Sequence, residues 1–280
     1  MGHVAVVTDS TASLPARLIE AAGIVVVPLD VVVDGVPHRE GLDITTAQIV
    51  SSLRSGAIVR TAQPGPEAFA RAYARVAARG ATEIVSVHLS GELSGTATSA
   101  GIAAQSAAVP VHVVDSRTVG MALGFAALRA ARSGLTEGAA VARAAEERAA
   151  RTTVRFAVDT LEYLRAGGRL GPLAATLGTV LGLRPVLAVR EGRLDVVERV
   201  RTSGRARERV IEMAVADAAR RGRVEMAVHH LGDPDLAAGV AERLRAACGP
   251  RLGPVHVAEI SAVVGAHVGP GLLAVVVADA

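Results

Sequence analysis

Short apolar runs alternate with helical patterns over the first half of the chain. Residues 3–10, HVAVVTDS, predict a buried strand, and residues 13–23, SLPARLIEAAG, predict a helix whose N-terminal cap is Ser13. The run at 24–40, IVVVPLDVVVDGVPHRE, predicts two strands around a bend, and helical spacing returns at 44–56. The chain therefore begins as strand, polar loop and helix, and it repeats this order.

The same alternation continues up to about residue 151. A short strand, a loop and a helix are predicted over 57–80, and strands at 82–90 and 109–116 flank a helix of small residues. Two alanine-rich helices follow. Strands that alternate with helices are typical of a parallel, right-handed α/β layer, so we predict one here.

The pattern changes after the alanine-rich helices. Residues 154–160 predict a strand, and 184–200 have the alternation and the Glu-Gly turn of a hairpin. A long helix at 203–221, another strand and helix, and two closing strands predict a mixed sheet. We therefore expect an α/β protein of two domains, an N-terminal parallel-sheet domain at 1–152 and a C-terminal α/β domain at 153–280.

Polar residues follow several of the predicted strands. Ligands of parallel sheets gather beyond the carboxyl ends of strands, and Asp9, Thr61, residues 90–96 and Asp115 all lie at such ends. The segment 85–102, VSVHLSGELSGTATSAGI, runs from a strand through a Ser/Gly loop into a helix. Such a junction directs backbone N–H groups and the positive end of a helix dipole at the loop, which predicts an anion site.

The junction also has other interpretations. A nucleophile elbow needs glycine two residues before its serine, and Glu92 stands two residues before Ser94, so the spacing excludes it. In the simplest alternative, Ser94 or Thr96 only caps the helix. An enzyme that acts on a small phosphorylated or acyl substrate at the Ser94 loop would need a base, for which His88 is the nearest candidate. A purely structural partner module would bind no small ligand.

The amino-acid composition excludes several kinds of catalytic and binding site. All 30 basic residues are arginine, because the chain contains no lysine. Schiff-base catalysis and a Walker-type phosphate loop are therefore excluded. The net charge is only +3 and aromatic residues make up 2% of the chain, so the sequence shows neither the basic stripe nor the stacking rings of a nucleic-acid-binding protein.

The cysteine content and the hydropathy of the chain indicate where in the cell the protein is expected. The single cysteine, Cys248, forms no internal disulfide, which is consistent with a reducing cytoplasm. We expect no secretory signal, since no cationic segment followed by an apolar one opens the chain. The least charged stretch, 170–183, is shorter than the ~20 residues that span a bilayer. His229 and His230 lack a clear third partner, so we expect them to be structural and predict no metal site.

Seven sequence blocks together point to one family. They are TDSTASLP (8–15), RTAQPGP (60–66), SGELSGT (90–96), VVDS (113–116), TLEYLRAGGRLG (160–171), LGLRPVL (181–187) and HVGPG (267–271). Each block alone is a weak signal, but seven in this order are specific. With them the chain resembles the DegV family, the bacterial fatty-acid-binding proteins of the fatty acid kinase system.

The resemblance implies a ligand and a place for it. In similar proteins a fatty acid lies in a tunnel between the two domains, and the threonine of a T-x-Q-P loop and the serine of an L-S-G-T loop hold its carboxylate. By position these residues are Thr61 and Ser94, with Gly95 as a backbone donor and His267 nearby. A carboxylate taken out of water must regain charge-assisted hydrogen bonds, and hydroxyl and helix N–H groups supply them.

The resemblance also implies a partner. The chain would be a lipid-binding carrier rather than an enzyme, without a cofactor, and would present a long-chain fatty acid to a kinase similar to dihydroxyacetone kinase. Arg169 would lie near the tunnel mouth and meet that kinase. We expect a cytoplasmic monomer that supplies phospholipid metabolism or buffers free fatty acids.

Some positions depart from the family pattern. Ala62 and Gly65 stand where the T-S-Q-P-S loop has serines, Gly91 replaces another serine, and Arg184 replaces the usual lysine. The predicted carboxylate-binding residues are unchanged. We therefore expect these departures to affect ligand preference more than ligand binding.

Overall fold

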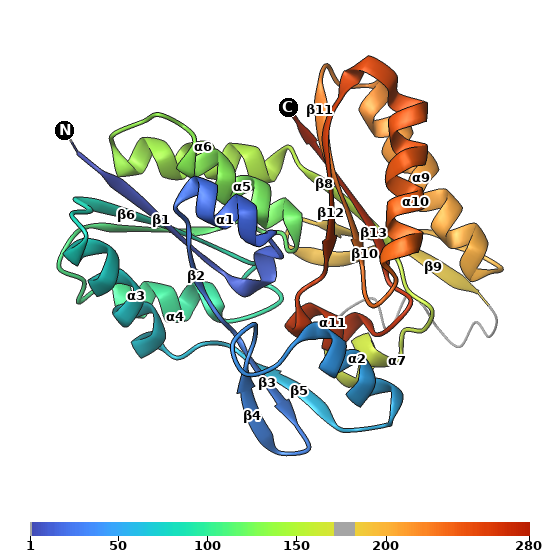
Figure 1. Ribbon diagram of the computed structural model, residues 1–280, viewed down its shortest axis with the longest axis horizontal. Helices are drawn as coiled ribbons and strands as arrows, with labels where there is room; N and C mark the ends of the chain where they lie inside the picture. Colours follow the sequence, from blue (N-terminus) through green and yellow to red (C-terminus); the bar gives the residue numbers. More distant parts are fainter. Residues whose placement is uncertain (1, 171–182) are drawn as a thin grey trace.

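The computed structural model describes residues 2–170 and 183–280. Within these residues the chain forms three sheets with helices packed around them (Figure 1). Most of the apolar stretch at 170–183, and the first two residues of the block at 181–187, lie outside the described residues.

The N-terminal half contains the predicted parallel sheet. All its neighbouring strands run parallel, in the order β2, β1, β6 and β7. Their bounds are Val25–Val27, Val4–Asp9, Glu83–His88 and Val111–Asp115. Two helices, α3 (Pro66–Ala78) and α4 (Thr96–Ala104), cover one face of this sheet, and α1 (Ala16–Ala22), α5 (Met121–Ala131) and α6 (Gly138–Ala150) lie on the other face (Figure 1).

The second sheet is the predicted mixed sheet. Its six strands lie in the order β10, β9, β8, β13, β11, β12, and only β11 and β12 are parallel neighbours. Their bounds in that order are Arg193–Val200, Arg184–Arg190, Thr153–Ala157, Leu273–Asp279, Val224–His230 and Leu252–Glu259. Helices α9 (Ser203–Ala219) and α10 (Pro234–Cys248) cover its outer face (Figure 1). The domain boundary near residue 153 stays a prediction.

The sequence analysis missed a third, antiparallel sheet. It consists of β4 (Val36–Arg39), β3 (Asp30–Val33) and β5 (Val59–Ala62). The expectation of two strands over 24–40 was wrong, because the segment forms three. Pro28 separates β2 from β3, and a second turn separates β3 from β4. Asp34 and Gly35 both have positive φ, 47° and 84°, which is the geometry of a tight hairpin. Helix α2 (Thr46–Arg54), which follows, starts at a capping box formed by Thr45 and Gln48.

A short helix between the closing strands was also missed. Helix α11 (Ala262–Val268) begins at Ser261, whose Oγ accepts a hydrogen bond from the Val264 N–H at 3.2 Å. Its β-branched residues and Gly265 are poor helix formers. The helix instead depends on packing against α2 and α7 (Glu162–Ala166). Two 3₁₀ turns, Ser10–Ala12 and Gly249–Arg251, complete the described elements.

The expected cap of the first helix was wrong. The residue before α1 is Pro15, which forms no side-chain cap, whereas Ser13 ends the preceding 3₁₀ turn with φ of 50°. The Ser13 hydroxyl accepts a hydrogen bond from the Ser261 N–H at 3.0 Å. Ser13 therefore joins the start of the chain to the start of α11 and does not stabilise its own helix.

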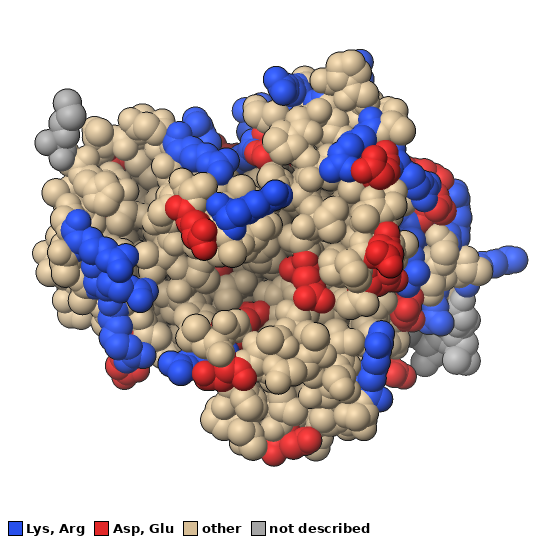
Figure 2. Space-filling view, viewed as in Figure 1, with Lys and Arg blue, Asp and Glu red and all other residues tan. Residues whose placement is uncertain are grey.

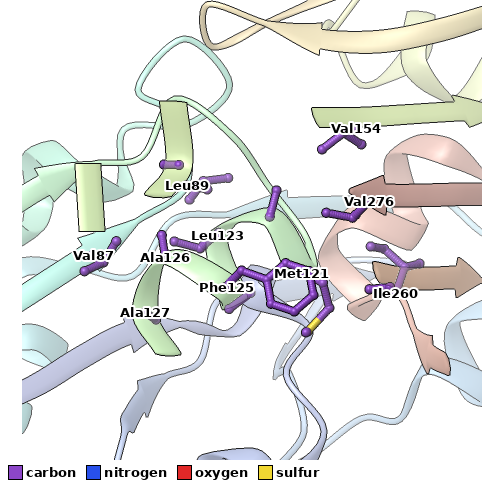
Figure 3. Close-up of a cluster of buried hydrophobic side chains, with 14 of the residues drawn as sticks. Val87, Leu89, Met121, Leu123, Phe125, Ala126, Ala127, Val154, Ile260 and Val276 are labelled. Carbon is purple, nitrogen blue, oxygen red and sulfur yellow. The ribbon is translucent and has the colours of Figure 1, made fainter. Parts of the chain in front are cut away.

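Helix α5 is apolar on all sides and joins the two larger sheets. Arg129 is its only exposed residue, and the others from Met121 to Ala130 are buried. Figure 3 shows α5 between Val87 and Leu89 on the side of the parallel sheet and Val154 and Val276 on the side of the mixed sheet. The two halves therefore share one hydrophobic core through this helix.

A buried histidine adds a polar contact to this junction. The Met121 N–H at the start of α5 donates to Nε2 of His229 at 2.9 Å, and Nδ1 of His229 donates to the Ala258 carbonyl at 2.9 Å. His229 is 1% exposed. Burial lowers the pKa of His229 to about 4, because the charged imidazolium would lose its hydration. The neutral imidazole therefore links α5 to β11 and β12.

The charged surface consists of arginine and carboxylate side chains. Figure 2 shows a strip of basic groups on the left, over α3, which carries the exposed residues Arg71 and Arg75 and is followed directly by the exposed Arg79. The sequence analysis had not identified this row. None of the Phe and Tyr side chains, all of which lie in the described residues, is exposed. The row therefore has no stacking ring beside it of the kind that single-stranded nucleic acids require.

We predict that His229 makes stability depend on pH. An unfolded histidine takes up a proton near pH 6.5 and folded His229 only near pH 4, so the unfolded chain binds the proton more readily between these values. The contribution of His229 to the free energy of unfolding should therefore fall by about 3 kcal/mol as the pH is lowered from 6.5 to 4. Urea unfolding at a series of pH values should show a shallower slope for His229→Gln. His3→Gln, at an exposed position, is the control, and equal slopes for His229→Gln and the unaltered protein would contradict the prediction.

Candidate functional site

A cavity of about 370 Å³ lies between the parallel sheet, the mixed sheet and α11. Its volume is within the range of roughly 300–1,000 Å³ that small-molecule sites occupy. Most of its wall is aliphatic and comes from both halves of the chain. The apolar lining includes Leu29, Leu89, Val119, Val154, Phe156, Val189, Ile260, Val264 and Leu272.

Polar groups in most of the wall have partners within the protein. Thr11 lines the cavity, and its N–H and hydroxyl both donate to the Asp9 carboxylate. His229 also lines the cavity with both ring nitrogens hydrogen-bonded, as described above. These groups have little remaining capacity to bind a ligand, so this part of the wall behaves as an apolar surface.

The apolar run at 24–33 contributes little to this wall. Of its residues only Leu29 lines the cavity. Val27 belongs to the core under α3, and Val31 to the core between β3 and α11. The other buried residues of the run therefore pack in the hydrophobic core and do not line the cavity.

A hydroxyl–imidazole pair lies at one place in the cavity wall. Thr61 Oγ1 and His267 Nε2 are 2.8 Å apart, although the residues are 206 positions apart in the chain. Thr61 is on β5, opposite Val31 of β3, and His267 lies in the last turn of α11. The turn after this helix begins at Gly269, whose φ is 72° and where a Cβ would collide with Tyr163.

The imidazole of His267 is neutral at ordinary pH. Burial, and to a smaller degree the charge of Arg169, lower the pKa of His267 to about 4. When its proton is on Nε2, this nitrogen donates to Thr61 Oγ1 and leaves the hydroxyl hydrogen of Thr61 free to bind a ligand oxygen. The pair can therefore present a hydrogen-bond donor without placing a charge in the cavity.

Ser94 forms a second hydroxyl pair beside the cavity. Its Oγ lies 2.9 Å from Thr96 Oγ1, and its N–H donates to the Ser90 carbonyl at 3.1 Å. The capping interpretation was wrong, because the residue before α4 is Gly95 and no side chain caps the helix. Ser94 lines the cavity, whereas Gly95 is not among the residues that line it.

Arg169 is part of the cavity wall. Its Nε donates to the Leu93 carbonyl at 3.1 Å, and its Nη1 donates to the Gly167 carbonyl at 2.7 Å. Gly167 lies against the ring of His267, where a Cβ would collide with Nδ1. Arg169 therefore ties the loop before Ser94 to the end of α7 and to the neighbourhood of His267.

These contacts bring the predicted site residues to one end of the cavity. Thr61, Ser94, His267 and Arg169 all line it, and they come from four separate parts of the chain. The sequence analysis did not single out Gln63, which lines the same end. Gln63 belongs to the same T-x-Q-P loop as Thr61, and that motif was the signal for it.

The candidate base for an enzyme is not beside Ser94. His88 is fully buried, donates from Nδ1 to Asp9 at 3.0 Å, and accepts at Nε2 from Ser86 at 2.7 Å. The Tyr73 hydroxyl donates to Ser86 in turn, and burial raises the pKa of Tyr73 to about 12. This chain of hydrogen bonds occupies both nitrogens of His88. Over residues 2–170 and 183–280, no histidine is hydrogen-bonded to Ser94.

The described residues show neither a metal-binding cluster nor a membrane-spanning helix. Histidine, cysteine and carboxylate side chains form no group of three or more suited to hold a metal ion in that part of the chain. Within the same residues, no helix combines the length and the apolar character that crossing a membrane requires.

Comparisons with known proteins give consistent results. The family model described as "Uncharacterised protein, DegV family" matches residues 3–280. A DegV domain-containing protein of Streptomyces coelicolor is 49% identical over 279 residues, which are 99% of each chain.

Solved structures of similar proteins share the fold. A DegV family protein from Thermus thermophilus, described as binding fatty acid, has a TM-score of 0.91 at 38% identity and matches 99% of this chain and 100% of its own. DegV of Bacillus subtilis, described as a fatty acid binding protein, has a TM-score of 0.92 at 29% identity, with 100% of both chains covered. The predicted fold class is therefore confirmed.

Proposed function

Since almost its whole length matches the family model, the chain belongs to the DegV family, and we propose that it binds one long-chain fatty acid and presents it to a partner kinase. The acyl chain would occupy the apolar part of the cavity, and its carboxylate would lie at Thr61 and Ser94. The two similar proteins described as fatty acid binding, at 38% and 29% identity, support this proposal.

The observation that carries the proposal is the distribution of polarity in the cavity. Its wall is mostly apolar, and the polar side chains without a full set of internal partners, Thr61 and Ser94, line one end. Each methylene of an acyl chain that leaves water contributes about 0.8 kcal/mol, so the tail supplies most of the binding free energy. The polar end then fixes which way the ligand enters, because a carboxylate requires hydrogen-bond donors.

The head group would be held by neutral donors. Thr61, backed by neutral His267, and Ser94, backed by Thr96, each offer a hydroxyl, and the Gly95 N–H is a further candidate donor. Hydrogen bonds to a carboxylate are stronger than those between neutral groups. We propose that two hydroxyls share the two carboxylate oxygens.

Phosphoryl transfer would belong to the partner, a fatty acid kinase similar to dihydroxyacetone kinase. The lysine-free chain has no Walker-type loop, which supports a division of labour between a carrier and a kinase. Arg169 is partly exposed at the same end of the cavity as the proposed carboxylate site, a position suited to meet the kinase. We propose a cytoplasmic carrier that acts as a single chain, because one chain supplies both halves of the cavity.

Native mass spectrometry of the purified protein tests the proposal, followed by organic extraction of whatever it carries. A stoichiometric adduct that releases a free fatty acid is the expected result, and it identifies the chain length at the same time. A ligand-free protein that also takes up no added fatty acid would overturn the proposal.

We predict that Ser94→Ala weakens fatty-acid binding and leaves the fold intact. The loss of one hydrogen bond to a charged group corresponds to about 1–3 kcal/mol. Titration with a fluorescent fatty acid measures the change, and Ser106→Ala, at an exposed serine beyond the other end of α4, is the control. Equal affinities for Ser94→Ala and the unaltered protein would remove Ser94 from the site.

We predict that Arg169→Ala reduces kinase-dependent acyl-phosphate formation more than it reduces fatty-acid affinity. Arg165→Ala removes an exposed arginine from neighbouring α7 and is the matched control. Both quantities are measured with the purified kinase and fatty-acid-loaded carrier. A variant that is phosphorylated at the normal rate would argue against contact between Arg169 and the kinase.

A further inference from the structure

Gln63 lies at the mouth of the cavity and contacts α4. Its Nε2 donates to Ser99 Oγ at 3.2 Å, across 36 positions of the chain. Ser99 is 3% exposed and lies one turn into α4, where its N–H donates to the Gly95 carbonyl. The carboxamide of Gln63 therefore reaches from the loop after β5 to the first turn of α4.

The same carboxamide fills the space beside Gly95. A Cβ on Gly95 would collide with Oε1 of Gln63 and would lie 2.9 Å from its Cδ. Gly95 has φ of −73°, a conformation that every residue type adopts. The backbone does not require glycine at this position, so the close approach of Gln63 is what leaves no room for a side chain.

The two segments that Gln63 joins carry the two proposed carboxylate ligands. Thr61 lies two residues before Gln63, and Ser94 lies immediately before Gly95. Apart from Gln63 and the packing of α3 on α4, these segments are connected through His267, Gly167 and Arg169 to the Leu93 carbonyl. Gln63 closes this series of contacts into a ring around one end of the cavity.

We propose that Gln63 is a positioning residue that fixes the separation between the hydroxyls of Thr61 and Ser94. This inference rests on the proposed function, because a fixed separation matters when both hydroxyls bind one carboxylate. A ligand with two head-group oxygens depends on the geometry of both hydroxyls. A ligand with a single oxygen is satisfied by one of them.

The test compares two ligands of equal chain length, palmitic acid and hexadecan-1-ol, by titration calorimetry. Gln63→Ala should lower the affinity for the acid by about 5- to 10-fold and change the affinity for the alcohol by less than about twofold. Gln105→Ala removes an exposed glutamine at the other end of α4 and should change neither affinity. Thermal unfolding of each variant checks that the fold is retained.

A second variant tests the contact from its other side. Gly95→Ala should displace the carboxamide and lower the affinity for the acid to a similar extent. In the Gln63→Ala/Gly95→Ala double variant the new methyl group has room, so its affinity should equal that of Gln63→Ala alone. Additive losses in the double variant would overturn the proposal.

The other outcomes distinguish a failure of this proposal from a failure of the function on which it rests. If the unaltered protein binds neither ligand, the proposed function fails. If the unaltered protein binds the acid and Gln63→Ala binds it equally well, the function stands and the positioning role is overturned. Equal losses for the acid and the alcohol would also overturn it, since they would indicate a general structural effect.

Discussion

The burial of α5 between two sheets is the constraint on which the rest of the structure depends. A surface helix has one apolar stripe, whereas α5 has apolar residues on all sides and needs a cover on each. The parallel sheet, the mixed sheet and α6 supply these covers, so separating the two halves would expose the helix to water (Figure 3). The space beside the N-terminal end of α5, at Gly120, forms part of the cavity.

The same constraint explains the chemical character of the cavity. Its lining side chains belong to strands and helices whose other faces form the core, so most of them are aliphatic. The few polar ones in this wall, such as Thr11 and His229, are hydrogen-bonded inside the protein. Hydroxyl groups that can each form a further hydrogen bond lie where loops and helix ends converge, at Thr61 and Ser94. The fold thus places an apolar compartment beside a polar end, which Arg169 also lines.

Much of this architecture can be predicted from the sequence, because the periodicity of apolar residues marks the strands and helices of the two larger sheets in their order along the chain. Short elements stabilised by tertiary contacts escape such prediction: α11 has β-branched residues and a glycine, and it forms because α2 and α7 pack against it. The site residues Thr61, Ser94 and His267 came from motif resemblance, and the cavity does bring them to one end. No local pattern reports that Gln63 reaches Ser99 or that Arg169 bonds the Leu93 carbonyl, since these contacts depend on the relative placement of distant segments.

The distance along the chain between Thr61 and His267 has a consequence for protein synthesis. The ribosome completes β5 early, but α11 emerges only after two hundred more residues have been added. Until then the polar end lacks its imidazole, and the mixed sheet lacks β13, which pairs with both β8 and β11. A nascent or truncated chain that lacks α11 therefore has no complete pocket.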